Sequence, residues 1–313
     1  MKFATVTLNP AIDLTATVRN FTLDAVNRGE SMQMDAGGKG VNVASFLADY
    51  GCEVAATGFL GRENAEIFER LFDRKQIEAR FVRVSGANRV GIKVVDPANQ
   101  TTTDLNLPGL APSEEDAQAL VERVEQMAVT GEFGWFILSG RPAQGLSDDF
   151  YAGLIARLKR VGVRTALDTS QEALRKGAAA GPDLIKPNLE ELRQLVGREP
   201  EGDDGILQAA SALLEQGIGC VAVSMGARGA LLVDRGEAWL AEPPRVKVAS
   251  TVGAGDAMLA GLALGQSQGL NPAECGRLAT AFAVSAVTRI GAHLPPRAEL
   301  DEYARKVTLR RVQ

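Results

Sequence analysis

The chain has 313 residues, of which 45% are apolar and only 5% aromatic, so it is long enough for an aliphatic core in one large α/β domain or two smaller ones. Its 34 Lys and Arg against 39 Asp and Glu give a net charge of −5, which argues against nucleic acid or an anionic membrane as the main partner. Three scattered cysteines without CxxC spacing fit a reducing cytoplasm, and the apolar run at 3–8 is far shorter than a signal segment or a membrane span.

Short apolar runs alternate with helical patterns along most of the chain. The predicted strands are 3–8, 53–59, 133–139, 163–168, 183–185, 220–224 and 230–233. The predicted helices are 40–50, 65–74, 113–127, 148–160, 189–195, 205–216, 257–266, 272–288 and 297–307. This alternation is typical of an α/β fold with a mainly parallel sheet covered by helices on both faces, whose active sites lie at the carboxyl ends of the strands.

Two segments, approximately 13–35 and 90–107, interrupt this alternation with polar, alternating strands and no helix between them. The second segment reads as a hairpin with its turn at 96–99. We interpret both as parts of a small β-sheet lid on a single domain that spans residues 1–313. A sheet this small rarely stands alone, so it should cover a site, pair with a second subunit, or do both.

Residues 250–256 read STVGAGD and lead directly into the predicted helix at 257–266. Backbone N–H groups at a helix start are unpaired, and the helix dipole adds partial positive charge there, so small residues before Asp256 would let an anion approach closely. An aspartate beside a bound phosphate is suited to act as the general base in phosphoryl transfer to a hydroxyl, although aspartate is also a common helix cap.

A second glycine-rich turn, GGKG at 37–40, places Lys39 and Asn42 near the start of another predicted helix. Neither turn is a Walker loop or a GxGxxG motif. One such turn is equally well explained by tight strand–helix packing, whereas two turns with these polar residues favour a ligand site. The only histidine, His293, has no partner motif, so we expect a carboxylate or a lysine as the base and a structural role for His293.

The order and spacing of several motifs resemble the ribokinase-like (PfkB) sugar kinases over essentially the whole chain. Residues 37–44 resemble the first signature of that family, 250–256 the second, 186–191 its KPNxxE segment and 224–230 its S-x-G-x-x-G nucleotide loop. Residues 7–13 are similar to its phosphosugar branch, and 103–106 and 168–174 are most similar to the 1-phosphofructokinases. The resemblance implies a ribokinase-like fold and an ATP- and Mg²⁺-dependent conversion of fructose 1-phosphate to fructose 1,6-bisphosphate.

Other functions stay open at this point. Relatives that phosphorylate tagatose 6-phosphate or fructose 6-phosphate share the motifs and often carry an arginine near position 104, where Asp104 of this chain would repel a phosphate. Residues near Asp104, Asn106 and Arg141 are expected to separate these substrates. A non-catalytic sugar-phosphate sensor on the same fold is a further alternative, which the intact Asp256 and its glycine turn argue against.

The resemblance also implies a role for individual residues. Asp256 is the general base, and the N–H groups of Gly253, Ala254 and Gly255 hold the transferred phosphoryl group. The implied substrate contacts are Asp13, Gly38, Lys39, Asn42, Arg89 as a phosphate clamp, Asn106 and Ser139. The implied nucleotide contacts are Lys186, Asn188, Ser224, Gly226, Gly229 and Thr251. The residues implied to help hold Mg²⁺, through waters, are Glu191, Asn188 and Asp168.

Ordinary structural roles compete with several of these assignments, since Asn188 is a typical helix cap, Gly226 and Gly229 are typical of a hairpin turn, and Arg89 could be a solvated charge. Ser250 stands where ribokinase itself carries an aspartate at a monovalent-cation site, so the resemblance does not extend to potassium stimulation. The expected partners are a phosphosugar, ATP and a second copy of the chain bound through the lid. Neither nucleic acid nor a membrane is expected, and the expected location is the cytoplasm.

Overall fold

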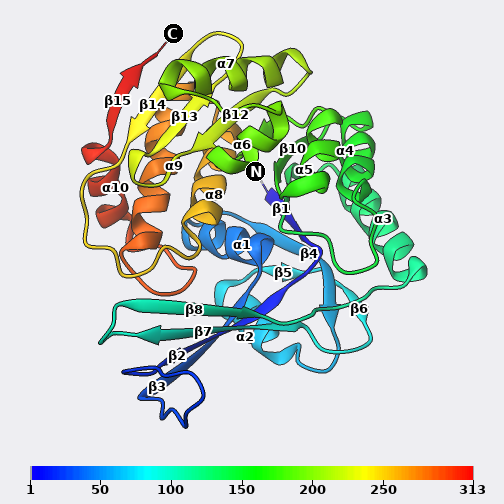
Figure 1. Cartoon of the computed structure of the whole chain (residues 1–313). Coiled ribbons are helices and arrows are strands. Elements are labelled where there is room, and N and C mark those ends of the chain that lie inside the picture. Colours follow the sequence, from blue (N-terminus) through cyan, green and yellow to red (C-terminus); the bar gives the residue numbers. More distant parts are fainter. Residues whose placement is uncertain (1, 313) are drawn as a thin grey trace.

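The computed structural model describes residues 2–312, which form two sheets and their surrounding helices (Figure 1). The larger sheet has 11 strands: β1 (Lys2–Thr7), β4 (Val54–Gly61), β5 (Glu78–Ala79), β6 (Val82–Val84), β9 (Phe133–Ser139), β10 (Arg164–Asp168), β11 (Leu184–Ile185), β12 (Cys220–Ser224), β13 (Ala230–Val233), β14 (Ala238–Glu242) and β15 (Thr308–Arg311). The strand order is β15-β14-β13-β12-β11-β10-β9-β1-β4-β5, with β6 also paired to β4. Strands β12 to β5 along this order are parallel, and β13, β14 and β15 add an antiparallel edge.

Helices cover both faces of this sheet. Those that pack in one core cluster are α1 (Lys39–Asp49), α2 (Glu66–Lys75), α8 (Ala254–Ser267), α9 (Pro272–Val287) and α10 (Arg297–Lys306). Those that pack in the other are α3 (Glu114–Val129), α4 (Phe150–Arg160), α5 (Gln171–Ala179), α6 (Leu189–Val196) and α7 (Gly202–Glu215). The predicted α/β fold, a mainly parallel sheet covered by helices on both faces with a separate small sheet, is therefore confirmed. None of the helices within 2–312 is long and apolar enough to span a bilayer.

The alternation of side chains between the two faces of the main sheet explains why its strands lie where apolar runs predicted them. Phe3 and Trp135 lie in the first core cluster, whereas their chain neighbours Ala4 and Phe136 lie in the second. Successive side chains of a strand point to opposite faces, so a strand between two helical layers needs apolar residues at every position. The continuous apolar runs of β1 and β9 meet that requirement.

Five elements were missing from the predicted set, namely the strands β5, β6, β14 and β15 and the helix α5. The four strands are only two to five residues long, and β15 reads Thr-Leu-Arg-Arg with mostly exposed side chains, so it carries no apolar pattern. Helix α5 contains Gly177, which weakens its helical pattern. The structure shows why glycine stands there: a Cβ would lie 2.5 Å from Cδ2 of Leu167, so the helix packs directly on β10.

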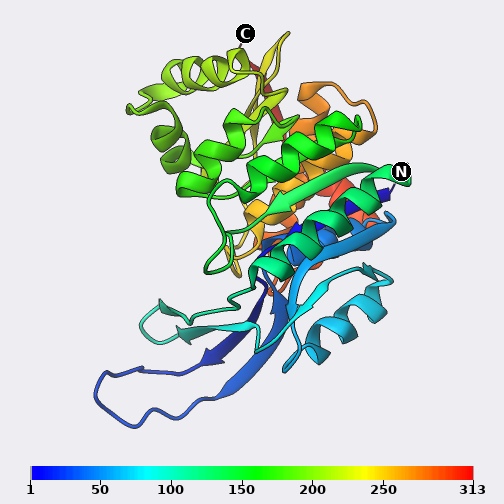
Figure 2. The same ribbon diagram turned by 90° about the vertical axis from the view of Figure 1, so that its right-hand side faces the viewer.

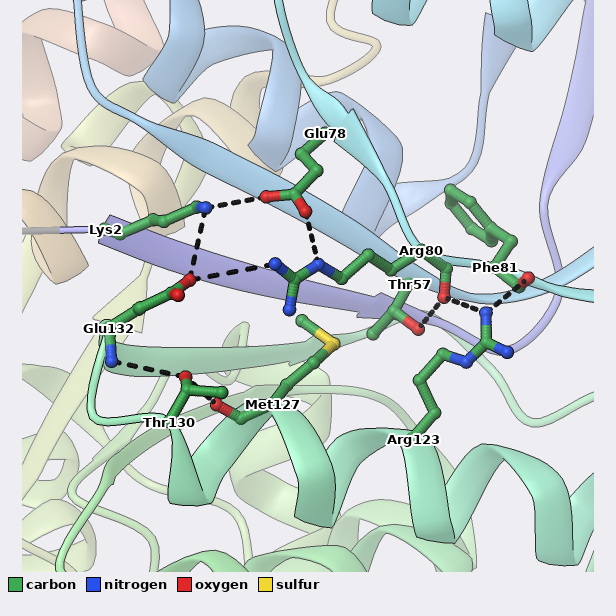
Figure 3. Close-up of polar contacts among 9 residues, drawn as sticks. All are labelled: Lys2, Thr57, Glu78, Arg80, Phe81, Arg123, Met127, Thr130 and Glu132. Carbon is green, nitrogen blue, oxygen red and sulfur yellow. Dashed lines mark hydrogen bonds and ion pairs between the residues drawn. The ribbon is translucent and has the colours of Figure 1, made fainter.

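The opposite edge of the sheet is held by charged side chains (Figure 3). Strand β5 has only two residues, and Glu78 on it bridges Lys2 at 2.6 Å and Arg80 at 2.5 Å, while Glu132 approaches the same two cations at 3.5 and 3.7 Å. Arg123 of α3 adds a hydrogen bond to the carbonyl of Arg80. Each exposed pair contributes little alone, but the network anchors a very short strand and places charge on an open edge.

The smaller sheet has four strands in the order β3 (Ser31–Gly37), β2 (Ala11–Thr17), β7 (Arg89–Asp96) and β8 (Thr101–Asn106). Both segments that broke the helix–strand alternation lie in it, and β7 and β8 form the predicted hairpin, with its turn at 97–100, one residue later than predicted. The small sheet extends away from the helices and the main sheet (Figure 2). Asp13, Thr15 and Thr17 share one face of β2, and the alternate residues, including Leu14, share the other.

Candidate active site

Helix α8 begins one turn earlier than predicted, at Ala254 instead of residue 257. Gly253 is its N-cap in a left-handed conformation (φ 81°), and no side chain caps the first turn. The prediction was wrong because glycine and alanine carry no apolar pattern. Asp256 consequently lies inside the first turn, directly beside N–H groups that a helix start leaves unpaired.

Helix α1 also begins without a side-chain cap, after Gly38 with φ 103°. A Cβ on Gly38 would lie 3.0 Å from Cα of Pro10, and one on Gly40 would lie 2.3 Å from Oγ1 of Thr7. Tight strand–helix packing therefore accounts for these glycines, as the simpler interpretation held. The same packing sets the start of α1 against α8, so two uncapped helix starts lie close together.

Asp256 is buried, with 6% of its surface exposed, and Nδ2 of Asn42 donates a 2.8 Å hydrogen bond to its Oδ2. Burial raises the pKa of Asp256 to about 6, although the positive charge of Lys39 and the hydrogen bond from Asn42 oppose this rise. A carboxylate with a pKa near the working pH can both ionise and accept a proton effectively. Asp256 therefore has the environment of a general base.

Asp168, at the carboxyl end of β10, lies between two lysines. Its Oδ1 is 3.0 Å from Nζ of Lys39, and its Oδ2 is 3.2 Å from Nζ of Lys186. Burial alone would raise the pKa of Asp168, but the two ammonium groups outweigh it and hold the pKa below its usual value. Burial likewise disfavours the charged form of Lys39, but Asp168 and Asp256 raise its pKa above the usual value. Asp168 and Lys39 are therefore both charged.

A cavity of about 370 Å³, here called the site cavity, brings most of the predicted residues together. Its lining comprises Asp13, Gly38, Lys39, Asn42, Arg89, Asp168, Lys186, Asn188, Glu191, Ser224, Val252, Gly253, Gly255 and Asp256. A second cavity of about 380 Å³, here called the sheet cavity, lies under the small sheet and includes Asn106 and Thr251. The two cavities share Asp13, Asn42, Val252 and Gly253 in their linings, so they adjoin.

The small sheet places two cations near these cavities. Arg89 lines the site cavity, its Nη1 lies 3.4 Å from Oδ1 of Asn106, and its buried Nε has no hydrogen-bond partner among residues 2–312. Lys93 lines the sheet cavity and pairs with Asp104 at 2.9 Å. Lys93 was not singled out in the sequence, because only the strand register brings it opposite Asp104. Burial raises the pKa of Asp13, although Arg89 and Lys93 oppose that rise.

Three residues that the resemblance assigned to the nucleotide or to Mg²⁺ have the ordinary structural roles that competed with ligand binding. Asn188 caps α6: its Oδ1 accepts from the N–H of Glu191 at 2.8 Å, and Oε2 of Glu191 accepts from the N–H of Asn188 at 2.9 Å. Gly229 turns the chain between β12 and β13, where a Cβ would lie 1.9 Å from the carbonyl of Ala241. Gly226 (φ 60°) has open space at the same point.

Some predicted residues lie outside both cavities. Ser139 is completely buried at the end of β9, and Gly226 and Gly229 do not line either cavity. Nε of Arg141 donates to Oγ of Ser170, 3.1 Å away. His293 lines a third cavity, behind the small sheet. Val252 lines both the site cavity and the sheet cavity, and no polar group marked it in the sequence.

Comparison with known proteins gives a consistent result. Residues 5–298 match the model of the pfkB family carbohydrate kinases. The chain is 48% identical over 310 residues to 1-phosphofructokinase of Rhodobacter capsulatus, covering 99% of this chain and 98% of that protein, and 38% identical over 307 residues to 1-phosphofructokinase of Vibrio cholerae, covering 98% and 96%. It superimposes on the crystal structure of Escherichia coli phosphofructokinase-2 in complex with substrates and products with a TM-score of 0.90 at 28% identity, covering 97% of this chain and 99% of that one.

Proposed function

The chain belongs to the pfkB family of carbohydrate kinases, and from this premise we propose that it transfers the γ-phosphoryl group of ATP to the 6-hydroxyl of fructose 1-phosphate, forming fructose 1,6-bisphosphate. It is a phosphotransferase that acts on an alcohol group. The observation that supports this proposal best is Asp256, a buried carboxylate with a pKa of about 6 in the uncapped first turn of α8. Base and anion site are adjacent, as direct phosphoryl transfer requires.

Asp256 accepts the proton of the 6-hydroxyl while that oxygen forms a bond to the γ-phosphorus. The bond from phosphorus to the β–γ bridging oxygen breaks at the same time, and ADP leaves with the electron pair. The N–H groups of Gly253, Ala254 and Gly255 donate to the transferring oxygens, and Lys39 and Lys186 balance their negative charge. Such a transfer depends on position and charge, and no covalent enzyme intermediate is part of the proposal.

Arg89 is proposed to hold the substrate's 1-phosphate, and Asp13, Gly38 and Asn42 to hold the sugar. The guanidinium of Arg89 reaches the site cavity from the small sheet. Substrate binding would therefore draw that sheet over the cavity as a lid and exclude water. Asn106 contacts Arg89 and extends the sugar contacts. Ser139 was predicted to join this set from the motif, but it is enclosed by protein.

The nucleotide is proposed to lie along Lys186, Asn188, Ser224, Gly226, Gly229 and Thr251. Glu191 and Asn188 would hold Mg²⁺ through waters, because Mg²⁺ prefers oxygen ligands and commonly takes only one or two protein carboxylates beside substrate phosphates. Within residues 2–312, no three His, Cys, Asp or Glu side chains are grouped as metal ligands, and a water-held ion fits such a sparse donor set. When bound, Mg²⁺ supplies positive charge to the phosphates; Asp168 adds to the local field while contacting the lysines.

A comparison of kcat/KM for fructose 1-phosphate, fructose 6-phosphate and tagatose 6-phosphate, each with ATP and Mg²⁺, tests the substrate. The expected preference is for fructose 1-phosphate, with product identified as the 1,6-bisphosphate. A preference for either 6-phosphate sugar would replace the substrate assignment within the family. Binding of phosphosugar without turnover of any of the three would support a sensor instead.

A homodimer through the lid is also proposed. Met34, Leu14, Ile92 and Leu105 form one cross-strand row, on the face of the small sheet opposite Asp13. Met34 is 47% exposed and Leu105 is 51% exposed, so the row presents apolar surface that pairing would bury. Sedimentation should show a dimer for the native chain and a monomer for Met34→Lys, and a purely monomeric native chain would reject the proposal.

A further inference from the structure

Asp168 is buried against two lysines. These two ion pairs explain the position of its carboxylate better than binding of a metal ion does. Asp168 is 1% exposed, and each of its carboxylate oxygens lies against a different ammonium group, Lys39 at 3.0 Å and Lys186 at 3.2 Å. The two lysines come from distant elements, the start of α1 and the residue after β11. Asp168 is therefore the one side chain within 2–312 that is ion-paired to both.

Both lysines line the site cavity together with the start of α8. A Cβ on Gly255 would lie 3.4 Å from Nζ of Lys186, so this ammonium is against the first turn of α8. Lys39 lines the same cavity, and its charge acts on Asp256. Two flexible side chains of like charge would separate without a shared anion, because their mutual repulsion and solvation both favour that.

The geometry points to Asp168 as a positioning residue that holds the ammonium groups of Lys39 and Lys186 on opposite sides of the phosphoryl group during its transfer. Lys39 would face the acceptor side, near Asp256, and Lys186 the donor side, near Gly255. This inference rests on the proposed phosphoryl transfer, and it assigns Asp168 to lysine placement in preference to metal ligation. In this proposal Asp168 acts through the two lysines.

The test compares dependence on Mg²⁺ with turnover, using the phosphosugar that the native chain converts fastest. Asp168→Asn should lower kcat by about 10- to 100-fold, the cost of a displaced catalytic group, while the Mg²⁺ concentration that gives half-maximal rate changes by less than about twofold. Glu191→Gln is the matched control and should raise that Mg²⁺ concentration. A tenfold rise for Asp168→Asn would overturn the inference in favour of metal ligation, and a kcat within about twofold of native would overturn it outright.

Asp168→Asn leaves the buried Lys186 and the partly exposed Lys39 without their shared counter-ion, so a second comparison covers the case in which the variant does not fold. Lys186→Gln retains the Lys39–Asp168 pair, and the double variant Lys186→Gln with Asp168→Asn carries the same net charge at this cluster as the native chain. The second substitution should again lower kcat without changing the Mg²⁺ requirement, because it frees Lys39. Equal kcat in the two variants would contradict the inference. Loss of the proposed function itself is distinguishable, since the native chain would then turn over none of the phosphosugars.

Discussion

Nδ2 of Asn42 donates a 2.8 Å hydrogen bond to Oδ2 of Asp256, and this contact joins the start of α1 to the start of α8 across 214 residues of chain. The bond fixes one carboxylate oxygen of a side chain that lines the site cavity. It also stabilises the ionised form, which a base needs before it can accept a proton. The pair thus links the fold of two distant helices to the chemistry between them.

Replacing Asp256 by Asn should remove turnover while leaving nucleotide binding nearly intact. The amide keeps the shape and the contact with Asn42 but cannot accept the proton, so kcat should fall by roughly 10²- to 10⁴-fold or more. Steady-state kinetics and calorimetric ATP titration measure the two effects. Asp204→Asn is the control, because Asp204 is an exposed carboxylate in the first turn of α7, and its kinetics should match the native chain. Retained turnover in Asp256→Asn would refute the assignment of the base.

The pH profile of kcat/KM should fall on the acid side of about pH 6, where Asp256 becomes protonated. Asn42→Ala removes a hydrogen bond that lowers this pKa, so its acid limb should move to higher pH, whatever the change in absolute rate. Rates measured from pH 5 to 9 with both substrates below KM give the limb directly. An acid limb near pH 4 would mean that the carboxylate is solvated in the free enzyme.

Stability should respond to the same carboxylate with the opposite sense from activity. Because the folded-state pKa of Asp256 is raised from 3.8 to about 6, the native state binds its proton more tightly than the unfolded chain, and stability from this group is lost as pH rises through 6. Asp256→Asn removes that loss, so it should gain about 1.5 kcal/mol at pH 5 and about 3 kcal/mol at pH 8. Denaturant melts at the two pH values measure the difference. A gain that shrinks with rising pH would show that burial does not dominate here.

Substitutions at the two glycines of the β12–β13 turn should distinguish a role in folding from a role in ligand binding. Gly226→Ala meets open space, so it should cost only about 1–2 kcal/mol for its left-handed backbone while raising KM for ATP. Gly229→Ala would force a Cβ to 1.9 Å from the carbonyl of Ala241, so it should destabilise the chain by roughly 3 kcal/mol or more. Thermal melts and ATP kinetics on both variants provide the comparison. Equal melting temperatures would show that the turn can shift.

Arg89→Lys should raise KM for the phosphosugar by about 10- to 100-fold with a smaller change in kcat, because a lysine cannot match two phosphate oxygens at once. Unphosphorylated fructose, tested as a poor substrate or inhibitor, should bind equally to both forms. Arg141→Lys tests whether the second candidate arginine binds the substrate's phosphate instead. The KM of this variant for the phosphosugar should stay unchanged, since Arg141 is hydrogen-bonded to Ser170 outside both cavities. A larger effect at Arg141 would exchange their roles.

Local patterns predicted most of the fold, because buried parallel strands such as β1 and β9 require unbroken apolar runs and their connecting helices carry clear periodicity. The motifs also predicted most residues of the site cavity. Side-chain contacts that depend on the folded structure could not be predicted from local patterns. The pairing of Lys39 with Asp168 spans 129 residues, and that of Lys93 with Asp104 depends on hairpin register. The start of α8 was misplaced since small residues are compatible with both a turn and a helix.

The bond between Asn42 and Asp256 also constrains when activity can arise during synthesis. Strand β1 and helix α1 emerge early, but β1 must wait for β9 on one side, and α1 for α8, before the base is oriented. A nascent chain that has not released α8 from the ribosome therefore lacks both the proton acceptor and the amides that receive phosphate. Incomplete chains of this protein therefore cannot consume ATP in this reaction, and truncation anywhere before α8 should yield a catalytically inactive product.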